Sequence, residues 1–333
     1  MRVDMKKTIS VLLVVLIAFA ALSACSGTPK THEIENPISQ AETETPTPQP
    51  KMGNHMSQVE RGSASWGEVY PDHFFYDSFA DAAADIKELN IYDEELDSTY
   101  VIHVSLPPDY DENKSYPIFV MLDGLWRVLD LVALRPMMVD GEIEDIIIAT
   151  IAFAYGPIEE IGKVRQKDFV QRYAPLLDFV TDNLMPYLGE CYNIDYSRSA
   201  LHGHSFAGLF TYYAVFRHDT YENEPFDYYV LSSPTLGAAR LYYDWRQPDD
   251  WHEFYDPEAE YWDRQETLDK ELYLVAGNAD PDPAMLPDID AFMERMNTRG
   301  VTTIEHRIYE GEHSDYVSAM LRDALLKFYG TGQ

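Results

Sequence analysis

The fold of this chain is decided by one segment, Ser199-Ala200-Leu201-His202-Gly203-His204-Ser205-Phe206-Ala207-Gly208-Leu209-Phe210. We expect a short apolar strand from Ala200 to His204 and, directly after it, an apolar helix from Phe206 to Arg217. The turn between them carries a serine flanked by small residues, which let the helix pack closely on the strand. This context predicts a nucleophile elbow with Ser205 as the nucleophile. The usual pattern is G-x-S-x-G, and Ala207 is a mild departure from it.

Outside this segment, short apolar runs alternate with amphipathic stretches, a pattern typical of an α/β sheet with helices on its faces. Continuous apolar runs are typical of central parallel strands buried on both faces. Such runs cover Ile118 to Leu122, Ile146 to Phe153, Ala200 to His204, Tyr228 to Leu231 and Leu272 to Ala276, whereas Tyr100 to Leu106 alternates. A further helix is expected from Phe169 to Leu188, and another near the C-terminus. We therefore predict an α/β fold with a mostly parallel central sheet and helices on both faces.

A serine hydroxyl is a weak nucleophile until a base takes its proton, so a histidine must lie at the same edge of the sheet. His313 follows the expected strand Ile304 to Tyr309 and precedes the last helix, which places it at the carboxyl end of a strand. Open α/β sheets place their sites at that edge. We predict His313 as the base. His306 lies inside the strand and is the weaker candidate, while His202 and His204 fit packing roles.

A third group should orient the base and stabilise its imidazolium. The stretch GNADPD, residues 277–282, follows another expected strand, and the chain order serine, acid, histidine suits this architecture. We choose Asp280 first and Asp282 second, although aspartates beside prolines commonly form turns. A site run by Ser205 and His313 alone is a third alternative.

Two backbone N–H groups are expected to hold the oxyanion of the reaction intermediate. Phe206 stands at the head of the helix after Ser205, where N–H groups are free to donate. The second donor is expected in the loop after the early central strand, where glycine lets the backbone turn toward the serine. The N–H of Gly124 or Leu125 would serve there, and an ordinary glycine turn is the alternative.

The first 24 residues resemble the signal peptide of a bacterial lipoprotein. Three basic residues precede an apolar run of 14 residues, Ile9 to Leu22, which falls short of the roughly 20 residues that span a bilayer. Small residues then lead to Cys25, the expected site of lipidation. Residues 25–62 contain five prolines and no apolar periodicity, so we expect a disordered tether. Residues 63–333 remain as a single domain, held by lipid at the extracytoplasmic face of the cell membrane.

The charge of the chain excludes several classes of partner. There are 57 acidic and 25 basic side chains, a net charge of -32, and loss of residues 1–24 removes three basic and one acidic side chain to give -34. Nucleic-acid binding relies on a basic footprint, so no nucleic-acid partner is expected. An anionic lipid surface would repel the domain, so attachment has to come from acyl chains. The other cysteine, Cys191, has no zinc-binding spacing, and no metal is expected.

An aromatic-rich insert is expected at about residues 236–268, after a strand at the site edge. Its rings are Tyr242, Tyr243, Trp245, Trp251, Phe254, Tyr255, Tyr261 and Trp262. They could form an aromatic wall for a catechol, phenolic or sugar ester, or they could pack the insert onto the domain.

Six blocks of sequence, in order, resemble the Putative esterase family of α/β-hydrolases, most of all its enterochelin-esterase-like branch. They are Leu106-Pro107-Pro108-Asp109-Tyr110, then Tyr116-Pro117 through Leu122-Asp123-Gly124, Arg165-Gln166-Lys167-Asp168-Phe169, Gly203-His204-Ser205-Phe206-Ala207-Gly208, Leu231-Ser232-Ser233-Pro234 and Gly311-Glu312-His313. By position the resemblance implies Ser205 as nucleophile and His313 as base, whereas the family's acid is variable.

The implied function is hydrolysis of a small-molecule carboxylic ester through an acyl-enzyme, with no metal or organic cofactor. Siderophore esters are the first expectation for the substrate. Feruloyl or acetylxylan esters are an alternative, and a binding lipoprotein that keeps the fold without turnover is another.

Overall fold

The computed structural model describes residues 55–59, 86–238 and 256–332. All of them belong to one compact unit, Met52–Gln333. Several expected segments lie outside the described residues: the signal peptide, Cys25 and most of the tether. Residues 239–255 of the aromatic insert also lie outside them. Within the described ranges, no helix combines the length and hydropathy needed to cross a bilayer.

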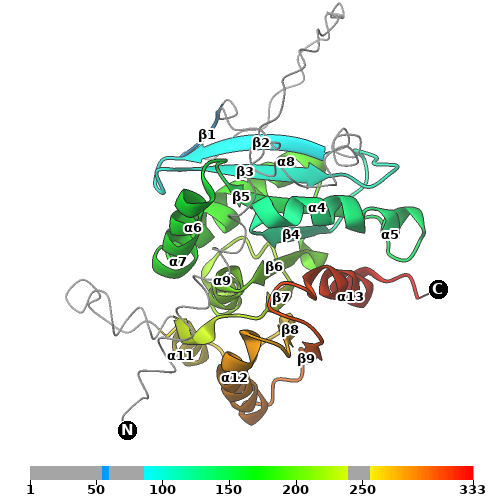
Figure 1. The fold of residues 1–333 in the computed structure, drawn as a ribbon. Coiled ribbons are helices and arrows are strands. Elements are labelled where there is room, and N and C mark those ends of the chain that lie inside the picture. Colours follow the sequence, from blue (N-terminus) through cyan, green and yellow to red (C-terminus); the bar gives the residue numbers. More distant parts are fainter. Residues whose placement is uncertain (1–54, 60–85, 239–255, 333) are drawn as a thin grey trace, which may run out of the picture. The chain divides into compact units, whose positions relative to one another are not determined.

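Nine strands form a single sheet in the order β1-β2-β3-β5-β4-β6-β7-β8-β9 (Figure 1). The strands are β1 (Met56–Gln58), β2 (Ile86–Asp93), β3 (Ser98–Ser105), β4 (Ile118–Leu122), β5 (Ile147–Phe153), β6 (Ala200–His204), β7 (Tyr228–Ser232), β8 (Glu271–Gly277) and β9 (Ile304–Tyr309). From β5 to β9 every neighbouring pair is parallel, while β1, β2, β3 and β5 pair antiparallel. The predicted mostly parallel α/β sheet is confirmed.

Strand β1 lies inside residues 25–62, where the sequence predicts a tether. It pairs with β2 in antiparallel register, with Met56 opposite Asp93 and the Met56 side chain buried. The folded unit therefore begins earlier than expected. A strand of three residues with one apolar side chain is too short to give a periodic signal, and only its pairing with β2 defines it.

Helices cover both faces of the sheet. They are α4 (Gly124–Leu134), α5 (Pro136–Val139), α6 (Ile158–Gln166), α7 (Tyr173–Asp178), α8 (Met185–Tyr192), α9 (Phe206–Val215), α11 (Pro257–Arg264), α12 (Leu286–Thr298) and α13 (Val317–Tyr329). The helices α4, α5 and α13 share a buried apolar cluster with strand residues such as Met121, Val230 and Val275. On the other face, α9 packs against β6 and β7, and Phe292 of α12 contacts Tyr212 and Phe216.

The single helix predicted from Phe169 to Leu188 is divided in the structure. Two π-helical turns, η2 (Lys167–Gln171) and η3 (Phe179–Leu184), alternate with α7 and α8. Proline occurs in the first turn of α7 (Pro175) and of α8 (Pro186). Because proline has no N–H to donate, a regular run of i to i−4 hydrogen bonds cannot pass through either position.

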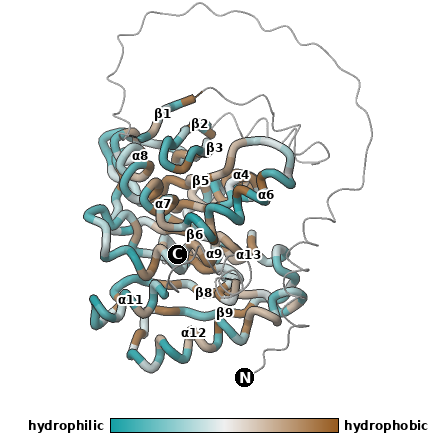
Figure 2. Tube along the Cα trace, turned by 90° about the vertical axis from the view of Figure 1, so that its left-hand side faces the viewer, coloured by the Kyte–Doolittle hydropathy of each residue, from teal (hydrophilic) through white to brown (hydrophobic). Residues whose placement is uncertain are grey.

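Apolar residues concentrate along the strands, and polar residues occupy the outer turns of helices such as α12 (Figure 2). The strands β4 and β5 are buried along their whole length. Burial on both faces explains why their sequences read as continuous apolar runs rather than alternating ones.

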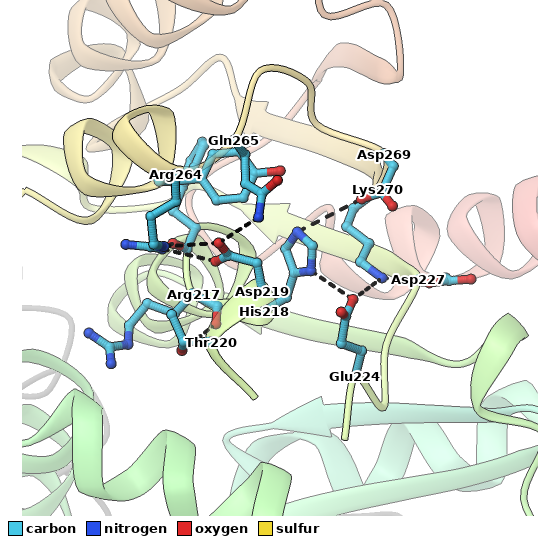
Figure 3. Close-up of polar contacts among 12 residues, drawn as sticks. Arg217, His218, Asp219, Thr220, Glu224, Asp227, Arg264, Gln265, Asp269 and Lys270 are labelled. Atoms are coloured by element: carbon cyan, nitrogen blue, oxygen red, sulfur yellow. Dashed lines mark hydrogen bonds and ion pairs between the residues drawn. The ribbon is translucent and has the colours of Figure 1, made fainter. Parts of the chain in front are cut away.

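A cluster of charged side chains lies where the chain enters β7 and β8 (Figure 3). Lys270 Nζ, nearly buried, contacts Asp227 at 2.8 Å and Glu224 at 2.9 Å, and Glu224 also contacts His218 Nδ1 at 2.9 Å. Arg264 at the end of α11 forms a separate ion pair with Asp219. These contacts join segments at the amino ends of two parallel strands, so this cluster has a structural role away from the carboxyl edge.

Candidate active site

Ser205 lies at the turn between β6 and α9, as predicted. Its backbone has φ 62° and ψ -117°, a conformation that residues other than glycine rarely adopt. Backbone hydrogen bonds hold it there: its N–H donates to the carbonyl of Ser232 at 2.9 Å, and its carbonyl accepts from Leu209 at 3.0 Å. The serine is therefore presented on a sharp turn at the carboxyl edge of the sheet, with helix α9 beginning at the next residue.

The close approach of α9 to β6 depends on glycine. A Cβ atom on Gly203 would lie 2.1 Å from the carbonyl oxygen of Ala207. One on Gly208 would lie 2.9 Å from the carbonyl oxygen of Ser232. Gly203 and Gly208 are thus both required by space, and Ala207 between them is fully buried.

His313 lies in the loop between β9 and α13, at the carboxyl edge. Its Nδ1 is hydrogen-bonded to Oδ1 of Asp282. The ring of His313 also lies 4.4 Å, centroid to centroid, from the ring of His204, the residue directly before the nucleophile. The structure therefore brings the predicted base to the elbow. His306, the weaker candidate, lies within β9 opposite Leu274 and not at the strand's end.

The carboxylate on His313 belongs to Asp282, the second choice from the sequence, and not to Asp280. Asp282 is fully buried at the start of the 3-10 turn η6 (Asp282–Ala284), whereas Asp280 is exposed. The other oxygen of Asp282 accepts hydrogen bonds from the Gly277 N–H and from the Ser233 hydroxyl. The turn after β8 therefore points its second aspartate inward. Asp280 lies in the turn itself, the role that aspartates beside prolines commonly have.

These hydrogen bonds determine the ionisation of Asp282. Burial alone would raise the pKa of this carboxyl, but the hydrogen bond and charge of His313, with the donors Ser233 and Gly277, hold it below the ordinary value. Asp282 is thus an anion at neutral pH. A buried anion on Nδ1 fixes the ring orientation of His313 and leaves Nε2 as the proton-accepting atom.

One tyrosine hydroxyl and two serine hydroxyls extend the network behind Asp282. Tyr316 at the start of α13 contacts the hydroxyls of both Ser232, at 3.1 Å, and Ser233. Ser232 in turn contacts His204 Nδ1 at 3.0 Å. Sequence reasoning did not find this network, because its members come from β6, β7 and α13 and share no spacing. Only the register of neighbouring strands, with His204 opposite Ser232, brings them together.

His202 and His204 occupy the packing positions that the sequence predicts for them. Both are buried, and burial is the main reason that their pKa values fall, that of His202 to about 3. The charge of Arg127 lowers both pKa values further, and His313 also lowers the pKa of His204. They are therefore neutral, and neither ring nitrogen of His202 has a hydrogen-bond partner among the described residues.

The predicted oxyanion donors lie at two helix N-termini. Gly124 and Leu125 are the first two residues of α4, and Phe206 is the first residue of α9. The first N–H groups of a helix have no acceptor within it and carry partial positive charge. The preceding strands β4 and β6 are parallel neighbours, so both helices begin at the same edge. This arrangement can stabilise a negative oxygen placed between them.

Arg165 joins these two helix starts, a role that no sequence pattern indicates. It donates to both carboxylate oxygens of Asp123, each at 2.7 Å, and to the carbonyl of His204 at 3.1 Å. Asp123 precedes Gly124, and His204 precedes Ser205. The partners are far apart in the chain, and no spacing rule relates them.

Two rings of the aromatic insert lie in the described part of the chain. Tyr261 is buried and contacts Phe216 with ring centroids 5.6 Å apart, and Trp262 contacts Tyr261. Both therefore pack α11 onto the domain. The remaining six aromatic residues of the insert fall within residues 239–255, outside the described ranges.

A mostly parallel sheet with helices on both faces, a serine on the strand-to-helix turn and a histidine after the last strand define an α/β-hydrolase. The chain belongs to the Putative esterase family, which residues 94–317, about two thirds of its length, match. It is accordingly a carboxylic ester hydrolase. A search of curated proteins found no match.

Solved structures share the fold. The BES protein from Bacillus cereus is similar with a TM-score of 0.57 at 20% identity, over 74% of this chain and 95% of that one. The siderophore hydrolase EstB from Aspergillus nidulans gives a TM-score of 0.55 at 22% identity, over 74% of this chain and 96% of that one. The enterobactin esterase FES from Shigella flexneri gives a TM-score of 0.55 at 18% identity, over 73% of this chain and 58% of that one.

Proposed function

We propose that this chain is a serine esterase that hydrolyses small carboxylic esters with Ser205, His313 and Asp282. One observation carries the proposal: the buried carboxylate of Asp282 is hydrogen-bonded to His313 beside the strained serine turn. A buried charge and a strained backbone at one sheet edge are costly to maintain and are typical of a catalytic centre.

In the proposed reaction, His313 Nε2 takes the proton of the Ser205 hydroxyl as the oxygen attacks the ester carbonyl. The N–H of Phe206 and that of Gly124 or Leu125 donate to the developing oxyanion. His313 then protonates the leaving alcohol. In the second half, His313 takes a proton from water as the water attacks the acyl-enzyme, and it returns that proton to the Ser205 oxygen as the carboxylic acid leaves. Asp282 remains ionised and stabilises the imidazolium throughout.

For the substrate, we propose the ester bonds of a siderophore-type trilactone. Support comes from the resemblance of the sequence blocks to enterochelin-esterase-like proteins and from two proteins that share the fold, a siderophore hydrolase and an enterobactin esterase. Feruloyl and acetylated-sugar esters are the competing substrates in the test below.

We also propose that the enzyme works at the extracytoplasmic face of the cell membrane, anchored through lipid on Cys25. The support is the sequence alone: basic residues, an apolar run and small residues directly before the cysteine. Metabolic labelling with a fatty-acid analogue tests it. The wild-type chain should be labelled and recovered with membranes, and Cys25→Ser should be unlabelled.

The catalytic proposal is tested with a fluorophosphonate probe, which labels serines activated as nucleophiles. Wild-type protein should be labelled at Ser205, and Ser205→Ala should not be labelled while unfolding at a similar temperature. Folded wild-type protein that never reacts would instead indicate a binding protein on the same fold.

Initial rates with an enterobactin-type trilactone, feruloyl esters and acetylated sugars at equal concentration then rank the substrates. The trilactone should give the highest kcat/KM. A feruloyl or sugar ester that exceeds it would overturn the substrate proposal and leave the serine mechanism standing.

A further inference from the structure

Arg165 is a buried cation between two segments that the proposed mechanism uses. It is the penultimate residue of α6, and only 6% of its surface is exposed. Its guanidinium donates through Nε and Nη2 to both oxygens of Asp123, and Nη2 also donates to the carbonyl of His204. Three donor contacts thus join the end of β4 to the end of β6.

Aromatic rings surround the guanidinium and leave it little freedom. Its central carbon lies 5.3 Å from the ring centroid of Phe206 and 5.7 Å from those of Trp126 and Phe169. Phe206 and Trp126 belong to the two helix starts themselves. Arg165 therefore contacts each helix start twice, once through a hydrogen bond to a residue one or two positions before it and once through a ring on it.

Asp123 needs such a partner because its carboxylate is buried. It has φ 60° and ψ 40°, the left-handed conformation, and it is the residue from which α4 begins. Its carbonyl accepts the N–H groups of Trp126 at 2.9 Å and Arg127 at 3.2 Å, so the first turn of α4 closes on it. A shift of Asp123 would therefore turn the N–H groups of Gly124 and Leu125.

We propose that Arg165 is a positioning residue that fixes the two halves of the oxyanion hole relative to each other. It holds Asp123, which precedes the donors Gly124 and Leu125, and His204, which precedes Ser205 and Phe206. It does not itself touch substrate. The proposal rests on the proposed serine mechanism. Because the donors matter most when the oxygen carries charge, loss of Arg165 should weaken binding of the transition state and not of the ester.

The test compares Arg165→Lys and Arg165→Gln with wild-type protein, using p-nitrophenyl butyrate as substrate. Lysine keeps the charge and loses the planar fork, while glutamine loses both. A misplacement of about 1 Å can cost about 10²-fold in rate. We expect kcat to fall about 10-fold in Arg165→Lys and about 10²-fold in Arg165→Gln, with KM within about 3-fold of wild type.

A boronic acid that forms a tetrahedral adduct with Ser205 gives a second readout. Its inhibition constant should rise by the same factor as kcat falls, whereas inhibition by the product acid, which is trigonal, should hardly change. A purely structural role for Arg165 would not separate these two ligands. Asp123→Asn, which removes the other side of the ion pair, should give the same pattern.

Arg172 provides a matched control. It contacts the buried carboxylate of Asp168 through Nε at 3.0 Å and donates to one backbone carbonyl, that of Leu96, at 2.7 Å. As at Arg165, an arginine bonds a buried carboxylate and a backbone carbonyl, but here the contacts join η2 to the turn between β2 and β3. Arg172→Lys and Arg172→Gln should also lower the thermal midpoint, but they should leave kcat within about 3-fold of wild type.

The outcomes separate the two proposals. If wild-type activity does not depend on Ser205, the serine mechanism fails. If activity depends on Ser205, but the Arg165 variants fold and keep kcat and boronate affinity within about 3-fold, the positioning role fails. If Arg165→Gln does not fold, Arg165→Lys and Asp123→Asn decide by the same two readouts, and parallel losses in the Arg172 variants would also overturn the positioning role.

Discussion

Asp282 shows how much one side chain depends on its neighbours. It is an anion without solvent contact, and its stability comes from three donors: a ring nitrogen of His313, the hydroxyl of Ser233 and the N–H of Gly277. Removal of the charge would leave the tautomer of His313 unfixed while the rest of the site stays in place.

We therefore expect Asp282→Asn to lower kcat by about 10³- to 10⁴-fold, because the amide can donate to Nδ1 and stabilise the wrong tautomer. Asp280→Asn, two residues earlier and exposed, should retain kcat within about 3-fold. Rates with p-nitrophenyl butyrate from pH 5 to 9 make the comparison. Equal effects of the two substitutions would contradict the assignment of Asp282.

The choice between these two aspartates marks the limit of what the sequence reveals about single residues. Ser205 and His313 stand in recognisable contexts, a strand-turn-helix and a loop after the final strand. Asp280 and Asp282 share one turn, beside prolines, and both would satisfy the expected chain order. Only the path of the backbone after β8 decides which one turns inward, and that path depends on contacts with Gly277 and Ser233.

At the scale of elements, β6 and α9 form the unit that presents the nucleophile. Gly203 faces α9, and the space for its missing side chain is filled by the helix. A Cβ atom there would lie 2.1 Å from the Ala207 carbonyl oxygen and 2.4 Å from Thr211 Oγ1. Neither neighbour can withdraw easily, since Thr211 is itself hydrogen-bonded to Ala207 at 2.9 Å.

Gly203→Ala should therefore push α9 away from β6 and misplace Ser205 and Phe206. We expect a loss of stability of about 1–3 kcal/mol from overpacking, and a larger relative loss of kcat than of thermal stability. Urea unfolding and steady-state kinetics measure the two effects. Gly141→Ala is a useful control, because that glycine has φ 72° but open space around it, so it should lose stability and keep kcat.

Elements differ in how well the sequence predicts them. The continuous apolar runs of β4, β5, β6, β7 and β8 match the observed strands closely, because burial on both faces leaves little choice of residue. The predicted helix from Phe169 to Leu188 breaks at proline-containing turns, and β1 carries too few residues for any periodic signal. Elements whose residues are selected by burial are predictable, and those defined by a partner strand or a local break are not.

At the scale of the whole molecule, buried neutral histidines make folding sensitive to acid. The pKa of His202 falls from an ordinary 6.5 to about 3, first through burial and then through Arg127. As pH drops below 6.5 the unfolded chain binds a proton that the folded chain does not accept until about pH 3. Stability is therefore complete above pH 6.5 and declines as pH falls, by up to about 1.4 kcal/mol per pH unit for this residue.

His202→Leu should flatten this dependence. The leucine removes two ring nitrogens that have no partner in the described part of the chain, at similar volume, so the cost at pH 7.5 should be small. At pH 5 the variant should gain about 1–2 kcal/mol relative to wild type. Urea unfolding at both pH values tests this, and parallel stability curves for the two proteins would show that His202 does not titrate as described.

Three neighbouring parallel strands each end in the same unusual way. The residues directly after β4, β6 and β7 are Asp123, Ser205 and Ser233, and each has a positive φ, of 60°, 62° and 39°. Such conformations cost about 1–3 kcal/mol each in residues other than glycine. Folding stability and activity therefore oppose each other along this edge. Ser205→Gly should unfold at a higher temperature than Ser205→Ala, which keeps the strained Cβ, although both are inactive. Selection for heat resistance alone would accordingly favour glycine at the position where the esterase needs its serine.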